Sequence, residues 1–104
     1  MEGFDEYQAA ASKTAVYEDR MYPITSLMVE AAELADLFIK PMLRGDEKQI
    51  DPKKVISEAG DVLWNLAMIL DDFGIDFSYV AHANIEKLSN RMKNNTIKGD
   101  GDTR

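Results

Sequence analysis

The chain has 104 residues, a formal net charge of −7 and an apolar fraction of 45%. An apolar fraction of this size indicates a globular fold, and the length predicts a single domain. The absence of cysteine excludes a disulfide framework, a zinc–thiolate site and a cysteine nucleophile. The acidic balance argues against a nucleic-acid polymer as partner, because binding to a phosphate backbone needs a basic surface.

The sequence also predicts where the protein is located and how far its folded domain extends. The N-terminus lacks the features of a signal peptide, and no apolar run approaches the ~20 residues of a membrane span. We therefore expect a cytoplasmic protein without a membrane partner. Residues 95–104 are polar and rich in Gly and Asp, which predicts a flexible tail after a folded domain at residues 1–94.

Hydrophobic periodicity predicts two helices in the first half of the chain. The first is expected at about residues 4–17, where apolar side chains recur every three or four positions. Pro23 suits the first turn of the second helix, which is expected at about residues 24–39. Pro41 is expected to end or kink that helix, since proline disfavours the helical conformation at the preceding residue.

Capping signals predict two more helices. Asp51 with Pro52 indicates the start of a third helix, which should continue to Asp72 or Phe73 and stop at Gly74. A fourth helix is expected at about residues 77–93, with Asp76 as its cap. Four helices with mostly short connections predict an all-α four-helix bundle.

The third helix carries two neighbouring apolar stripes, which predict burial on more than one side. One stripe is formed by Val55, Ala59, Val62, Leu66, Ile69 and Phe73, and the other by Ile56, Leu63 and Leu70. In so short a chain this pattern predicts a subunit interface, in a dimer or a dimer of dimers.

Two acidic pairs stand out within the second and third helices. Glu30 with Glu33, and Glu58 with Asp61, have i, i+3 spacing, so each pair leaves one face of its helix. Carboxylates in apolar surroundings cost several kcal/mol in lost hydration unless a positive charge meets them. Four acids on two facing helices predict a Mg²⁺ site, because this ion prefers oxygen ligands and is often completed by phosphates and water.

Two alternative interpretations of the acids stay open at this stage. An acidic pair alone is common on solvated helix faces, although the apolar context of Glu58 and Asp61 favours a specific role. These acids would otherwise form ion pairs, for which Lys40, Lys54 and Lys87 are the candidate partners.

A line of polar residues on the fourth helix supplies positive charge. Asn84, Lys87 and Arg91 have i, i+3, i+7 spacing, and Lys and Arg are suited to binding phosphate. Their alternative is an ordinary polar helix face. The sequence has no glycine-rich phosphate loop, which excludes a P-loop enzyme. We expect Trp64 and Tyr79 to be core or interface residues rather than a base-stacking platform.

Together these motifs resemble those of the MazG-like nucleoside triphosphate pyrophosphohydrolases. The resemblance covers nearly the whole chain and includes Glu-Ala-Ala-Glu-Leu at 30–34, Glu-Ala-Gly-Asp-Val-Leu-Trp at 58–64 and Asn-Ile-Glu-Lys-Leu-Ser-Asn-Arg at 84–91. The chain departs from the family pattern at residues 22–25, Tyr-Pro-Ile-Thr, where many relatives have a more apolar, glycine-containing sequence.

The resemblance implies a hydrolase that cleaves a nucleotide, a (d)NTP, between its α and β phosphates and releases a monophosphate and pyrophosphate. It implies Mg²⁺ as cofactor, with Mn²⁺ as a substitute, and a homodimer or homotetramer. The implied metal ligands are Glu30, Glu33, Glu58 and Asp61. Glu33 is also our choice for the acid that orients or deprotonates water. The implied substrate-binding residues are Asn84, Lys87 and Arg91.

Two other classes of function compete with the enzyme. A helical adaptor would use the bundle only for assembly, with its acids held in ion pairs. A metal-dependent nucleotide sensor would bind without turnover, and an assay of pyrophosphate release separates it from an enzyme.

Overall fold

The computed structural model describes residues 3–94, and within them every regular element is helical. The elements are α1 (Phe4–Ser12), α2 (Met21–Leu43), the short 3-10 helix η1 (Glu47–Gln49), α3 (Pro52–Asp72) and α4 (Phe77–Lys93). The all-α, four-helix prediction is confirmed. None of these helices is long and apolar enough to cross a membrane. The predicted tail at residues 95–104 lies outside the described part.

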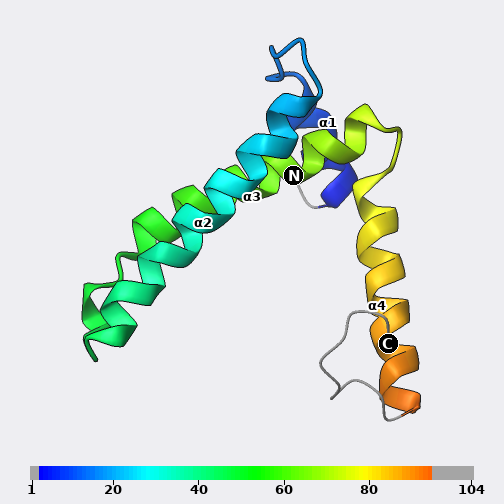
Figure 1. Ribbon diagram of the computed structural model, residues 1–104. Coiled ribbons are helices and arrows are strands. Elements are labelled where there is room, and N and C mark those ends of the chain that lie inside the picture. Colours follow the sequence, from blue (N-terminus) through cyan, green and yellow to red (C-terminus); the bar gives the residue numbers. More distant parts are fainter. Residues whose placement is uncertain (1–2, 95–104) are drawn as a thin grey trace.

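Helices α2 and α3 form a long antiparallel hairpin in which each packs along the other (Figure 1). Helix α2 begins at Met21, with Pro23 in its first turn, and continues through Pro41 to Leu43. Of the two predicted effects of Pro41, to end or to kink the helix, the first was therefore wrong. Pro41 lies in the last turn, and packing against α3 and η1 outweighs the single backbone hydrogen bond that proline cannot donate.

Helix α1 is shorter than predicted and ends at Ser12 rather than near Tyr17. The chain after Ser12 makes contacts that a continued helix would not make. The hydroxyl of Tyr17 donates to the Asp72 carboxylate at 2.7 Å, and its ring meets that of Trp64 edge-on at 6.1 Å. Because β-branched and aromatic residues favour helix only weakly, these tertiary contacts decide the conformation of this segment.

The predicted boundaries of α3 and α4 are confirmed. The Asp51 side chain accepts from the backbone N–H of Lys53 at 3.0 Å and caps α3. Gly74, with φ of 71°, reverses the chain after α3 in a conformation that other residues rarely adopt. Asp76 is at the N-cap position of α4, but its side chain makes no capping hydrogen bond.

Side chains of α1 cap α4 instead. Gln8 is buried, and its Oε1 accepts from the backbone N–H of Phe77 at 3.1 Å while its Nε2 donates to the carbonyl of Ile75 at 3.0 Å. Asp5 accepts from the backbone N–H and the hydroxyl of Ser78 at 2.9 and 2.6 Å. These hydrogen bonds lower the pKa of Asp5. Two residues of α1 thus fix the start of α4.

The buried core lies where α1, α3 and α4 meet. It is formed by Ala11, Ala67, Met68 and Phe77. Beyond this junction α4 leads away from the hairpin, and it contacts α1 and α3 but not α2 within the described residues (Figure 1). The radius of gyration is 16.5 Å, whereas a compact domain of this length has about 13 Å. The four helices of one chain are therefore not all packed side by side.

We predict that Gln8→Leu destabilises the protein by about 2–4 kcal/mol, because it leaves the buried N–H of Phe77 and the carbonyl of Ile75 without partners. Urea denaturation followed by circular dichroism measures the loss. Gln49→Leu, the same change at an exposed position, is the control and should be nearly neutral. Equal stability of the two variants would contradict the capping role of Gln8.

Candidate metal centre and phosphate-binding residues

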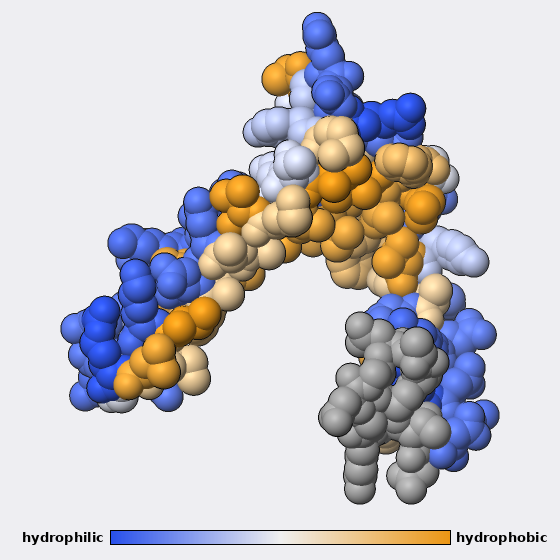
Figure 2. All heavy atoms as spheres, viewed as in Figure 1, coloured by the Kyte–Doolittle hydropathy of each residue, from blue (hydrophilic) through white to orange (hydrophobic). Residues whose placement is uncertain are grey.

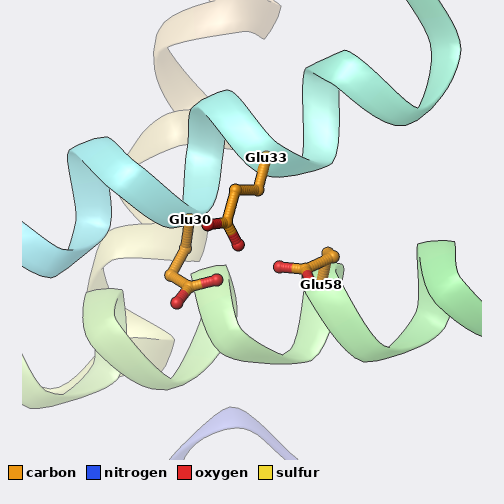
Figure 3. Close-up of side chains that lie close together, drawn as sticks. All are labelled: Glu30, Glu33 and Glu58. Atoms are coloured by element: carbon orange, nitrogen blue, oxygen red, sulfur yellow. The ribbon is translucent and has the colours of Figure 1, made fainter.

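The antiparallel packing of α2 on α3 brings acids from both helices together. Glu30, Glu33 and Glu58 each offer a carboxylate oxygen, and these oxygens lie within 4.8 Å of one another. Figure 3 shows Glu30 and Glu33 leaving the same side of α2 and pointing towards Glu58 on α3. The i, i+3 spacing of the first pair therefore has the geometric consequence that the sequence predicted.

Asp61, the fourth predicted acid, lies beside this three-acid cluster rather than in it. It follows Glu58 by about one turn of α3, and it lines a pocket of about 160 Å³ together with Glu30. The negative charge of Asp61 also helps to raise the pKa of Glu30. The structure thus gathers three of the four acids closely and places the fourth next to them.

Within the described residues, the candidate lysines do not support an ion-pair network for the acids of the cluster. None of the candidate lysines forms an ion pair with them within residues 3–94, and Lys40 instead pairs with Asp36 at 3.8 Å on the surface. Glu30 Oε2 and Glu58 Oε2 are shielded from solvent and have no hydrogen-bond partner there. Converging carboxylates with unpaired oxygens fit a hard divalent cation, because such an ion binds oxygen and compensates negative charge.

Crowding of the carboxylates changes the protonation of Glu30. The nearby Glu58 carboxylate can share a proton with it, and this, followed by loss of hydration and the charge of Glu33, raises the pKa of Glu30 to about 7. Adjacent carboxylates cannot all ionise cheaply, so one of them keeps its proton to a higher pH. A bound cation would favour the ionised form again.

This pKa predicts how stability and metal binding depend on pH. The pKa of Glu30 is about 7 when folded against an ordinary value of 4.5, so the folded state holds the proton more tightly. The corresponding stability is present in full below pH 4.5 and is lost as pH rises through 7. Without Mg²⁺, the melting temperature should therefore fall between pH 5 and 8. The affinity for Mg²⁺ should weaken below pH 7, because protons compete for the same oxygens.

Thermal melts at four pH values, with and without Mg²⁺, measure both effects. Glu30→Gln should flatten the pH dependence of the metal-free protein. A Glu30→Gln protein that keeps the parental slope would show that another group is responsible.

The predicted phosphate-binding residues lie on α4, away from the acids. Asn84 and Lys87 line a shallow pocket of about 430 Å³ with Tyr79 and Ile75, and Arg91 follows one turn later on the same helix. Tyr79 is 64% exposed, so it is not a core residue of a single chain. In the described chain, α4 makes no contact with α2, the helix that carries Glu30 and Glu33.

Sequence reasoning missed two residues next to the acids. Ser26 and Asn65 line the 160 Å³ pocket, together with Tyr22 and the partly buried Trp64. Their spacing in the sequence could have identified them. Ser26 precedes Glu30 by four positions, so it lies on the same face of α2. Asn65 follows Asp61 by four positions on α3 in the same way.

An all-α hairpin with facing acidic pairs defines a class of helical proteins with a candidate divalent-cation centre. Residues 23–96 match the family described as MazG nucleotide pyrophosphohydrolase domain, and the chain belongs to this family. The chain is also 33% identical over 112 residues to the Gene 37 protein of Mycobacterium phage L5, covering 96% of this chain and 97% of that protein. No solved structure matches the chain at a significant level.

Proposed function

We propose that the protein hydrolyses a nucleoside triphosphate between its α and β phosphates, with Mg²⁺ or Mn²⁺ held by the acidic cluster. The observation that carries this proposal is the convergence of carboxylate oxygens of Glu30, Glu33 and Glu58 within 4.8 Å of one another. Within residues 3–94 these acids form no ion pair with a lysine, and one oxygen each of Glu30 and Glu58 has no hydrogen-bond partner. Family membership supports the same reaction, because the matching domain is described as a nucleotide pyrophosphohydrolase.

The acids divide into two roles by exposure. Glu30 and Glu58 are half-buried and would hold the cation, with Asp61 beside them as a further ligand. Glu33 is the exposed member of the cluster, and its exposure supports it as the acid that would orient or deprotonate the attacking water. When bound, Mg²⁺ supplies positive charge that neutralises the phosphates and stabilises the charge that develops during cleavage.

Lys87 and Arg91 would bind the phosphates, and Asn84 would help to position them. Since α4 leads away from α2, we place these residues at the acids of a second chain in a homodimer or homotetramer. The open shape of one chain and its exposed apolar surface support this assembly (Figure 2). Exposed apolar side chains on the hairpin are Met28, Val29, Ile39, Met42, Leu43 and Ile56.

Ile56 gives this assembly a specific point of support. It belongs to the second apolar stripe of α3, and it is 72% exposed in the single chain. A second chain would cover Ile56 together with the other exposed apolar side chains of the hairpin, and the same contact would complete the site.

The first test of the proposal removes one metal ligand. Millimolar Mg²⁺ should raise the melting temperature of the parent by mass action, and Glu58→Gln should blunt that rise. Pyrophosphate release from a panel of canonical and modified (d)NTPs should fall at least about a hundredfold in this variant. Asp36→Asn, an exposed acid on α2, is the matched control and should keep both properties.

The proposed enzymatic activity would be refuted if Mg²⁺ does not raise the melting temperature of the parent and the parent releases no pyrophosphate from any nucleotide of the panel. A metal response with nucleotide binding but no turnover would identify the sensor instead.

The second test asks whether two chains build one site. Glu58→Gln and Lys87→Ala should each be inactive, but a mixture refolded at equal amounts should recover about a quarter of parental activity. Half of the dimers are then mixed, and one of their two sites carries intact acids and an intact Lys87. Light scattering should also give a mass of at least twice 11.7 kDa. A mixture without activity, or a clean monomer, would contradict the shared site.

A further inference from the structure

The three-acid cluster continues into the 160 Å³ pocket towards the N-terminal end of α2. Its lining residues are Tyr22, Ser26, Glu30, Asp61, Trp64 and Asn65. The volume corresponds to about five water molecules, which is enough for part of a small organic ligand. Asn65 lies seven residues beyond Glu58, about 10 Å along the helix. A group attached to a phosphate at the acids can reach this pocket.

Asn65 is the unusual residue of the pocket. It is 3% exposed, and its Nδ2 donates to the carbonyl of Asp61 at 2.9 Å. A carbonyl oxygen only accepts hydrogen bonds, so the atom of the Asn65 amide that faces the Asp61 carbonyl is the nitrogen Nδ2 and the other is the oxygen Oδ1. Its Oδ1 is shielded from solvent and has no hydrogen-bond partner within residues 3–94.

The hydrogen bonds of the described residues give no structural reason for a buried amide side chain at position 65. The carbonyl of Asp61 already has the backbone partner that an α-helix provides four residues later, so it does not need Nδ2. A buried acceptor without a donor destabilises the fold, and natural proteins keep few of them. Because Asn65 lines the pocket, a ligand that binds there would supply the missing donor.

Two aromatic rings give the pocket fixed walls. The Nε1 of Trp64 donates to the Thr14 hydroxyl at 2.9 Å, and the ring of Tyr17 packs edge-on against it. Tyr22 stacks on Tyr17 with ring centroids 5.7 Å apart and is 53% exposed. Flat, immobilised rings of this kind are suited to contact with a nucleobase or a sugar.

We propose that this pocket binds the nucleoside part of the nucleotide and that Asn65 determines which nucleoside is accepted. Its Oδ1 accepts a hydrogen bond from an N–H of the base or an O–H of the sugar. This inference rests on the proposed function, since the phosphates must lie at the acids.

Binding of two kinds of probe tests the role of Asn65 separately from the metal site. Inorganic tripolyphosphate carries the phosphates without a nucleoside, and α,β-imido (d)NTPs carry both but resist cleavage. Calorimetry in Mg²⁺ should show that Asn65→Leu keeps its affinity for tripolyphosphate and loses about tenfold or more for the preferred nucleotide. Its melting temperature without ligand should not fall, because the variant removes an unpaired buried acceptor.

Gln49→Leu is the matched amide-to-leucine control and should bind both probes as the parent does. Asn65→Ala, which also lacks the acceptor, should show the same split if the leucine variant does not fold. Comparing four bases, and deoxy with 2′,3′-dideoxy analogues, identifies the donor. Loss of base discrimination in the variant assigns the base N–H, and loss of discrimination against the dideoxy sugar assigns the hydroxyl.

Two results overturn the inference while leaving the proposed function intact. One is an Asn65→Leu protein that binds every nucleotide as the parent does. The other is a parent that binds tripolyphosphate as tightly as every nucleotide. A parent that binds neither probe in Mg²⁺ overturns the inference and the proposed function together.

Discussion

The packing of α2 against α3 is the contact on which the candidate site depends. Each residue turns an α-helix by about 100°, so a shift of the hairpin by one residue would separate Glu30 from Glu58. The packing of α2 along α3 keeps like charges close together at an electrostatic cost. That cost is visible in the raised pKa of Glu30 and in the unpaired oxygens of the cluster. Strain of this kind is expected where a protein prepares a site for a charged ligand.

Helix α1 controls the other half of the molecule through polar rather than apolar contacts. Gln8 and Asp5 occupy the N-terminal backbone groups of α4, so the direction of α4 follows from α1 and the turn at Gly74. Lys87 is therefore carried away from the acids of its own chain. The same geometry leaves apolar side chains of the hairpin uncovered (Figure 2). The distance between Lys87 and the acids and the exposure of the apolar side chains both follow from the direction of α4.

In the proposed function, the pocket beside the acids would connect cation binding to nucleotide selectivity. Acids that neutralise phosphate through a cation would treat all nucleoside triphosphates alike, because each carries the same triphosphate. Discrimination needs contacts with the nucleoside, and a buried acceptor rejects a ligand that cannot satisfy it. Asn65 lies on the same face of α3 as Glu58 and Asp61, so one helix face can hold both functions.

The sequence by itself determined the features of the protein that depend only on residues close together in the chain. The cap at Asp51, the stop at Gly74 and the shared face of Glu30 and Glu33 follow from local backbone geometry, and the order of the acidic pairs indicated the family. Tertiary structure alone decided the early end of α1, the direction of α4 and the unpaired oxygen of Asn65. The first two features depend on groups 50 or more positions away in the chain, such as Tyr17 with Asp72. Periodicity and capping report only the few nearest residues, so they cannot reveal which distant partner a side chain finds or lacks.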